Sequence, residues 1–436
     1  MQYQPRKRLR VKWRVAIPFF TLLFLIGYLL VHVFFLRESE DPNAVTICDF
    51  SAKSTVEKLH IESESQMVIS DYFFYGENLN LRKAAYHGEN DDEMIGKTVK
   101  LVNLCSGEPY LFNLDNKIDH QINVSELPNG FYELYYVYNL SDQRIVMDRA
   151  VNEIFHTMTR NSQSKKVELI ADNNYTKQEV PLKSYPLYLK VDSDIVQHDS
   201  LDIMLDPAGG NDDYGLGIDW GYQENGLNES DEMYSAALAL KERLEKYGLI
   251  VGITKDSANH EIDTYGVNGR LAKAYNKHAK LYINLQFNSM ANTDIRGMEI
   301  IHSSFSSSQL ANTLMYDLKK NVNVVGSTLY TSSGSVDGVI SASQTDCDNG
   351  SVCDDVIQIR ESGGKATKAG ECSENARNMN AFAKGNVFGM QALLIKFGYI
   401  SNAEDVAMWK DADRFSALMD EIARSIAASL KVVVEE

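Results

Sequence analysis

The segment Leu205 to Gly210 reads Leu-Asp-Pro-Ala-Gly-Gly and follows a short apolar run that begins at Leu201. Such a run ending in Asp-Pro and two glycines predicts a buried strand followed by a tight turn at Asp206. Downstream the apolar residues change to helical spacing, as in the stretch from Met233 to Tyr247, which Gly248 ends as a C-cap. Strands and helices then alternate. Residues 199–436 are therefore predicted to form an α/β domain with a mainly parallel sheet flanked by helices on both faces.

Three further segments follow this turn. Glu229 opens the predicted helix, Ile283 to Asn288 reads Ile-Asn-Leu-Gln-Phe-Asn, and Leu394 to Asn402 reads Leu-Ile-Lys-Phe-Gly-Tyr-Ile-Ser-Asn. In order and spacing the four segments resemble the zinc-dependent N-acetylmuramoyl-L-alanine amidases that cut peptidoglycan. That family has a DPGHGG turn, a helix-opening Glu, an S-I-H-x-N strand and a v-E-x-G-F-x-S-N strand. The resemblance spans Leu201 to about Val433.

The resemblance implies a zinc site that this chain lacks. In the family, zinc is held by the His of the turn, the helix Glu and the His of the third motif, and the Glu of the fourth motif is the general base. Here only Glu229 matches a ligand. Ala208 stands where the family has Gly-His, Gln286 replaces the second His, and Lys396 replaces the catalytic Glu.

These replacements are chemically unsuited to zinc hydrolysis. A catalytic zinc takes three protein ligands and keeps one open position. Ala208 has no donor atom, Gln286 offers only a neutral amide oxygen, and a protonated Lys396 repels a cation and accepts no proton. We therefore expect no intact catalytic residue, no metal and no other cofactor. The remaining pocket is predicted to contain Asp206, Glu229, Arg270, Gln286, Asn288 and Lys396.

Two interpretations of Lys396 remain open. Its ammonium group could occupy the vacated metal position and pair with Glu229, with Gln286 nearby, or it could extend from a strand end into solvent. No other histidine has ligand spacing to Glu229: His198 lies toward the opposite strand end, and His260, His278 and His302 belong to no short His/Glu motif.

The N-terminus predicts a membrane anchor. Residues 1–14 contain six basic side chains, and residues 15–36 are almost purely apolar. A helix of that run is about 33 Å long, enough for a bilayer core of about 30 Å. The charge asymmetry places residues 1–14 in the cytoplasm and the bulk of the chain outside. A cleaved signal peptide is the alternative, but no Ala-x-Ala site follows Leu36.

Charge and cysteines are consistent with an exported protein. The net charge is −17, and the part beyond the basic tail is more acidic still, which argues against nucleic acid as a partner. Cys347 and Cys353 are close enough in sequence to bridge a loop in an oxidising exterior. The other cysteines are Cys48, Cys105 and Cys372, and the odd total leaves at least one thiol outside any internal pairing.

Residues 41–198 are rich in short alternating runs and are predicted to form a β-sandwich-like exported domain. Its most aromatic run, Phe131 to Tyr138, fits either a core strand or a platform for glycans. Residues 324–384 are rich in Ser, Gly and Asp and are predicted to be an irregular insertion.

Three functions are compatible with this sequence. The first is a membrane-anchored, extracytoplasmic pseudoamidase that binds peptidoglycan or a cell-wall enzyme without hydrolysis. Proteins that share a fold need not share an activity, because activity depends on the residues of the site. The second is an active peptidoglycan amidase with replacement ligands. The third is an adaptor that acts through the β domain.

Overall fold

The computed structural model describes residues 66–83, 94–115, 117–139, 141–172, 184–213, 215–266, 268–303, 306–330, 336–342 and 387–432. The chain divides into two compact units, Met1–Thr46 and Ile47–Glu436, and all described residues belong to the second. The predicted tail (1–14), the predicted membrane segment (15–36) and most of the predicted insertion lie outside the described residues, as do Cys48, Cys347, Cys353 and Cys372. Cys105 is disulfide-bonded. Within the described ranges, no helix combines the length and the apolar character needed to cross a membrane.

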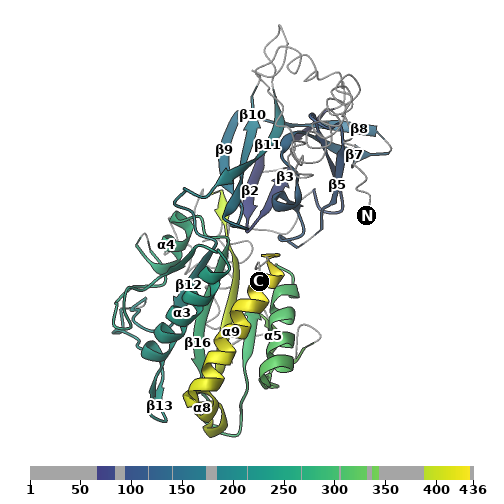
Figure 1. Ribbon diagram of the computed structural model, residues 1–436. Coiled ribbons are helices and arrows are strands. Elements are labelled where there is room, and N and C mark those ends of the chain that lie inside the picture. The colour runs from purple at the N-terminus through teal and green to yellow at the C-terminus, as the bar shows by residue number, and fades with distance from the viewer. Residues whose placement is uncertain are drawn as a thin grey trace, which may run out of the picture. The chain divides into compact units, whose positions relative to one another are not determined.

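The first part of the described chain consists of two β-sheets (Figure 1). The larger sheet has the order β5-β4-β7-β8-β11-β10-β9, with β1 paired to β8. Its strands are β1 (Gln66–Ile69), β4 (Thr98–Asn103), β5 (Pro109–Asn113), β7 (Gly130–Tyr138), β8 (Ser141–Met147), β9 (Val151–His156), β10 (Gln163–Ala171) and β11 (Tyr185–Ile195). The smaller sheet has the order β19-β2-β3-β6, from β19 (Phe388–Gly389), β2 (Asp71–Tyr75), β3 (Asn78–Arg82) and β6 (Ile122–Asn123), and a short 3-10 helix, η1 (Val124–Glu126), follows β6.

The two sheets share one apolar core. Phe74 and Leu79 from the smaller sheet belong to the same buried cluster as Val99 and Leu134 from the larger one. Every second residue of β4 is buried, as expected of strands that pack on one face. The described strands therefore form the two-layered arrangement that a sandwich requires.

The aromatic strand β7 is divided between core and surface. Tyr132 and Leu134 are fully buried in the shared core, whereas Tyr138 at the end of the strand is 50 % exposed. The first half of β7 is thus core, and its last residues reach the surface.

The second part is built around a six-stranded sheet with the order β15-β12-β16-β20-β17-β18. Its strands are β12 (Ile203–Pro207), β15 (Val251–Ile253), β16 (Leu281–Asn288), β17 (Glu299–His302), β18 (Val339–Ser341) and β20 (Gln391–Tyr399). All neighbours are parallel except β17 and β20, which run antiparallel. The prediction of a mainly parallel sheet is confirmed.

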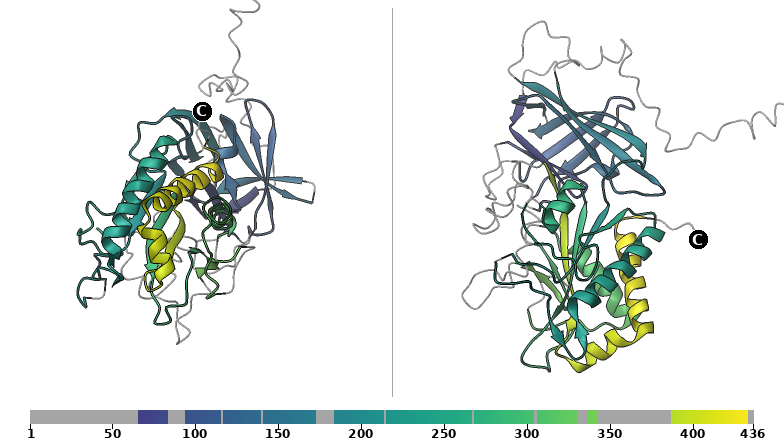
Figure 2. Two further views of the ribbon diagram at one scale, coloured as in Figure 1. Left: turned by 60° about the horizontal axis from the view of Figure 1, so that its bottom comes forward. Right: turned by 90° about the vertical axis from the view of Figure 1, so that its left-hand side faces the viewer.

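Helices cover both faces of this sheet, and Figure 2 shows α3 and α9 along one of them. The helices are α3 (Glu229–Lys246), α4 (Arg270–Asn276), α5 (Gln309–Val322), α8 (Ala403–Lys410) and α9 (Ala412–Ser429); a small hairpin, β13 (Gln223–Glu224) and β14 (Leu227–Asn228), precedes α3. Odd-numbered residues of β16 pack in the cluster with α3, α5 and α9. Tyr282 packs instead in the cluster with α4. This alternation assigns the two faces of the strand to two helix layers.

The structure differs from the sequence prediction between residues 324 and 384, where an irregular insertion was expected. Val339 and Ile340 of β18 are buried and pair in parallel with β17. A strand of three residues is too short a signal to be recognised within a Ser- and Gly-rich stretch.

Candidate functional site

The Asp206 carboxylate is a fully enclosed polar group at the carboxyl end of the sheet. It is fully buried at the end of β12, where Thr254 Oγ1 donates to Oδ1 at 2.6 Å. Asn284 Nδ2 donates to Oδ2 at 2.7 Å, and Tyr282 O–H donates to the same oxygen. Arg270 Nη1 lies 3.4 Å from Oδ1. These donors offset the cost of burying a carboxylate, so Asp206 acts as a structural anchor.

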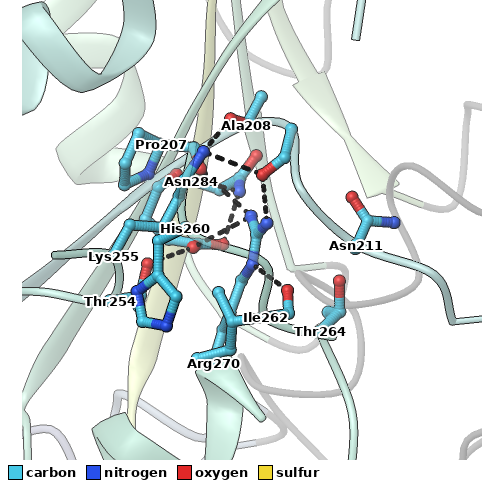
Figure 3. Close-up of polar contacts among 12 residues, drawn as sticks. Pro207, Ala208, Asn211, Thr254, Lys255, His260, Ile262, Thr264, Arg270 and Asn284 are labelled. Atoms are coloured by element: carbon cyan, nitrogen blue, oxygen red, sulfur yellow. Dashed lines mark hydrogen bonds and ion pairs between the residues drawn. The ribbon is translucent and has the colours of Figure 1, made fainter. Parts of the chain in front are cut away.

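Two cations hold the turn that follows Asp206 (Figure 3). Arg270, at the first position of α4, donates Nη1 to Pro207 O at 3.0 Å and Nη2 to Gly209 O. Lys255 Nζ donates to Ala208 O at 3.2 Å and Gly209 O at 2.9 Å. Burial lowers the pKa of Lys255 to about 8, and the nearby Arg270 guanidinium contributes to this shift. The carbonyl groups of the turn are therefore fixed by side chains from two other elements.

The two glycines of the turn, Gly209 and Gly210, occupy positions where any other residue would be strained. Gly209 and Gly210 have φ values of +81° and +87°, a region that other residues rarely adopt. A Cβ atom at Gly209 would lie 2.8 Å from Trp220 O, and one at Gly210 would lie 2.5 Å from His260 O. Of the three residues Ala208, Gly209 and Gly210, only Ala208 carries a Cβ atom.

Glu229 is the first residue of α3 and is almost fully buried. Its Oε1 accepts the N–H of Phe287 at 2.6 Å, and its Oε2 accepts the N–H of Tyr222 at 2.8 Å. Burial raises the pKa of Glu229 to about 7, although the two N–H bonds and the Lys396 charge oppose this rise. The carboxylate thus joins the loop before β13 to the end of β16.

Gln286 and Lys396 lie side by side on neighbouring strands. They are direct partners in the pairing of β16 with β20, and Lys396 is only 7 % exposed. The hypothesis that the Lys396 ammonium group pairs with Glu229 stays a prediction; the Lys396 charge lowers the Glu229 pKa. The carboxylate oxygens themselves are bonded to backbone N–H groups rather than to the ammonium group. Lys396 is buried, so the alternative interpretation, that its side chain extends from a strand end into solvent, is wrong.

These side chains line a cleft of about 420 Å³. Of the predicted pocket residues, Glu229, Arg270, Gln286 and Lys396 line it together with Ala208. Further lining residues, which the sequence did not single out, are Gly209, Asn211, Asp213, Asp219, Gly221, Tyr222, Thr264, Tyr265, Asn284 and Phe287. The motifs therefore converge on one cleft at the carboxyl ends of the parallel strands, where sites of α/β sheets lie.

Asp206 and Asn288 belong to the predicted pocket but lie behind the cleft. Asn288 Nδ2 donates to Glu299 Oε2 at 2.8 Å, and Tyr399 O–H donates to Glu299 Oε1 at 2.6 Å. Both residues are thus parts of buried networks that hold strand ends. They do not line the cleft.

A family model described as N-acetylmuramoyl-L-alanine amidase matches residues 203–428, more than half of the chain. The chain belongs to the N-acetylmuramoyl-L-alanine amidase family. The matched range runs from β12 into α9 and contains all of the cleft residues. The resemblance inferred from the four motifs is confirmed.

Several solved amidase structures are similar to this chain. AmiC2 of Nostoc punctiforme is 17 % identical over 54 % of this chain and 98 % of that chain, with a TM-score of 0.36. An amidase from Clostridium difficile 630 is 16 % identical, with coverages of 54 % and 98 % and a TM-score of 0.36. The CwlD amidase of Clostridioides difficile, solved in complex with the GerS lipoprotein, is 17 % identical, with coverages of 53 % and 99 % and a TM-score of 0.34. No curated protein matches the chain.

The cleft residues do not fit the zinc ion of the amidase family. Both oxygens of Glu229, the single family ligand present, already accept backbone N–H bonds. Ala208 supplies no donor atom, and Lys396 brings a cation into the same cleft. Among the described residues, no group of three His, Cys, Asp or Glu side chains is arranged to hold a metal ion.

The histidines considered as replacement ligands lie elsewhere. His198 stacks on His156 with ring centroids 4.0 Å apart, and His278 stacks on Phe388. His260 Nδ1 accepts the N–H of Asp256, and His302 Nδ1 contacts Ser303 O. None of the four lines the cleft.

Proposed function

We propose that this chain is a catalytically inactive member of the amidase family, which binds peptidoglycan or a cell-wall enzyme without cutting the amide bond. The observation that carries the proposal is the composition of the cleft. At the family's ligand and base positions stand an alanine, a glutamine and a lysine, and the remaining glutamate is committed to two backbone N–H groups. A site of this composition lacks the histidine ligands that hold zinc in the family, and the position of the family's general base carries Lys396, which accepts no proton when charged.

The proposal includes an export topology. The basic residues of segment 1–14 and the apolar segment 15–36 favour a single-pass anchor with its N-terminus in the cytoplasm. The folded part of the chain would then lie outside the membrane, where peptidoglycan is present. Protease accessibility of the C-terminus in intact cells tests this topology, and protection from external protease would contradict it.

Metal content and product release test the inactivity. We expect the purified full chain to retain no stoichiometric zinc after dialysis against a zinc buffer and to release no peptide from muramyl-peptide. The matched positive control carries Gln286→His, Lys396→Glu and Gly-His in place of Ala208. It should retain zinc if the lost ligands are the cause. Stoichiometric zinc together with peptide release in the unaltered chain would establish the second interpretation, an active peptidoglycan amidase with replacement ligands.

One observation favours the adaptor interpretation as a second candidate. A groove of about 460 Å³ in the β domain is lined by Tyr136, Tyr138, Gln66, Gln143, Met67, Val68, Lys83 and Lys97. Two tyrosine rings with centroids 5.9 Å apart, flanked by amide groups, offer both apolar faces and hydrogen bonds. If this groove carries the binding function, Tyr138→Ala should abolish peptidoglycan pull-down by the full chain, whereas Gln286→Ala should leave it unchanged.

A further inference from the structure

Lys280 carries a buried ammonium group that forms no ion pair with a described residue. Lys280 directly precedes β16 and is 1 % exposed. Its Nζ donates to Leu201 O at 3.3 Å and lies 5.6 Å from the centre of the Phe155 ring. Asp202 and Glu77 attract the ammonium group through space only. A buried cation without a direct counterion costs free energy, so this place in the fold tolerates little further positive charge.

Both of these carboxylates are held by other groups. Asp202 is fully buried, and its Oδ1 accepts the N–H of Thr159 at 2.9 Å. Glu77 accepts hydrogen bonds from two guanidinium nitrogens of Arg160, at 2.9 Å and 2.8 Å. Neither carboxylate can turn toward Lys280 without breaking these bonds. The Lys280 charge therefore has no close counterion among the described groups.

Three histidine rings lie close enough to be affected by this charge. The rings of His156 and His198 stack with centroids 4.0 Å apart, and the ring of His278 stacks on Phe388 at 4.1 Å. Burial, the His198 ring and the Lys280 charge together lower the pKa of His156 to about 4. Burial and the Lys280 charge also lower the pKa of His198 and of His278. The neutral state of the rings is thus the one that suits the folded chain.

Further charged groups face the two stacked rings. Asp194, near the end of β11, has its Oδ2 3.2 Å from His156 Nε2, and Asp199 favours a charge on His198. Lys166 on β10 opposes a charge on His156. Solvent screens the attraction of Asp194, because its side chain is 33 % exposed. The two carboxylates offset only part of the opposing effects, since the pKa of both rings remains lowered.

Residues 196–202, the linker, join β11 to β12, and His198 closes a turn within them. Its Nδ1 accepts the N–H of Ser200 at 3.3 Å, and its Nε2 lies 3.2 Å from Ser164 Oγ on β10. A ring nitrogen that accepts a hydrogen bond carries no proton, so protonation of Nδ1 would break the bond to Ser200. Protonation would also place a positive ring against the stacked ring of His156.

We propose that Lys280 and the three histidine rings form a proton-sensitive latch on the linker. With neutral rings, the linker is held against β9 and β10 by the stack of His156 on His198 and by the bonds of His198. On acidification the rings become positive beside a buried ammonium group, the bond to Ser200 breaks, and the linker is released. No residue that lines the cleft takes part, so the latch goes beyond the proposed function and does not depend on it.

The expected pH dependence follows from where the protons bind. In the open state each ring binds a proton at its ordinary pKa of about 6.5, whereas in the closed state it binds one only at lower pH. The open state therefore gains population as the pH falls below about 6.5. Burial lowers the pKa of Lys280 to about 8, so its charge is present over this whole range.

Hydrogen exchange of the full chain, followed by mass spectrometry of linker peptides, tests the latch. After correction for the intrinsic exchange rate, the protection of residues 196–202 should fall at least about tenfold between about pH 6.5 and about pH 5. Lys280→Met removes the buried charge, and His156→Phe keeps a ring for stacking that cannot bind a proton. In each variant the loss of protection should be at least about threefold smaller.

His120→Phe is the matched control, because His120 is an exposed histidine that pairs with Asp115. This control should lose protection as the unaltered chain does. Linker protection that does not change with pH, or that falls equally in all variants, would overturn the inference. An equal loss in peptides of β4 at the same pH would also overturn it, since that result would reveal unfolding of the whole chain rather than release of the linker.

Discussion

Gln286 and Lys396 are direct partners in the parallel pairing of β16 with β20, so the two side chains that replace a zinc ligand and the catalytic base lie next to each other in one cleft. Their neighbour Glu229 experiences the Lys396 charge without a direct bond to it. The cleft thus brings together a buried cation and a carboxyl group of raised pKa. Four predictions follow from the contacts that hold this arrangement.

Replacing Lys396 by methionine should raise the pKa of Glu229 above about 7. The ammonium charge currently opposes the rise caused by burial, and methionine fills a similar volume without charge. NMR titration of the glutamate carboxyl carbons measures the change. Lys319→Met is the control, because in the unaltered chain the Lys319 ammonium group pairs with the exposed carboxylate of Asp337. An unchanged Glu229 titration in Lys396→Met would show that the two groups do not interact.

Glu229→Gln should flatten the dependence of stability on pH. The folded-state pKa of about 7 lies above the ordinary value of 4.5, so the stabilising contribution of the protonated group is full below pH 4.5 and is lost as the pH rises through 7. The loss amounts to about 3 kcal/mol. Denaturant unfolding at several pH values should show the variant gaining stability relative to the unaltered chain across this range. Glu242→Gln, on the exposed face of α3, should not show this gain. A constant difference between the Glu229 variant and the unaltered chain would refute the assignment.

Gly221→Ala should destabilise the loop that Glu229 holds. A Cβ atom at Gly221 would lie within 2.4 Å of Glu229 Oε2, and the residue has φ +78°. Gly215→Ala is the matched control, because Gly215 has φ +66° but no heavy atom within 4 Å of its Cβ position. Both variants carry the strain of a positive φ, of about 1 kcal/mol, and only Gly221→Ala should add a steric cost of about 1–3 kcal/mol. Equal melting temperatures for the two variants would argue that the loop moves away freely.

Asp206→Asn should lower the free energy of unfolding by about 3–5 kcal/mol, because it leaves the buried Arg270 guanidinium without its carboxylate. Tyr282→Phe removes one donor to the same carboxylate and should cost only about 1 kcal/mol. Equilibrium denaturation of both variants separates the two contributions. A loss for Asp206→Asn no larger than that for Tyr282→Phe would contradict the anchoring role of Asp206.

The sequence predicted the composition of this site better than its internal contacts. The motifs identified Glu229, Gln286 and Lys396 because family spacing is a local property of the chain. The bonds of Glu229 to Tyr222 and Phe287 could not be predicted, since they depend on how a loop closes over a strand end. The period of two residues in β16 places Tyr282 on one face but does not indicate which carboxylate its hydroxyl reaches.

For the fold too, local sequence patterns were predictive, whereas features that depend on contacts between distant segments were not predicted. The alternation of strand and helix patterns along the chain predicted the mainly parallel sheet of the second part, and the helical spacing predicted α3. The position of β18 at the edge of the sheet was missed, because a strand of three residues derives its structure from the neighbour with which it pairs. Asn288 was assigned to the cleft from its motif, yet its partner Glu299 comes from another strand and draws it into a network behind the cleft.

If the chain is inactive as proposed, the turn after Asp206 makes that inactivity difficult to reverse. Two of its three residues must remain glycine, and its carbonyl oxygens are bonded to Lys255 and Arg270. A return to hydrolysis would require a codon insertion in this turn as well as two substitutions elsewhere, and each intermediate would carry an incomplete metal site. Under the proposed function, point mutation alone therefore offers no gradual route back to an enzyme.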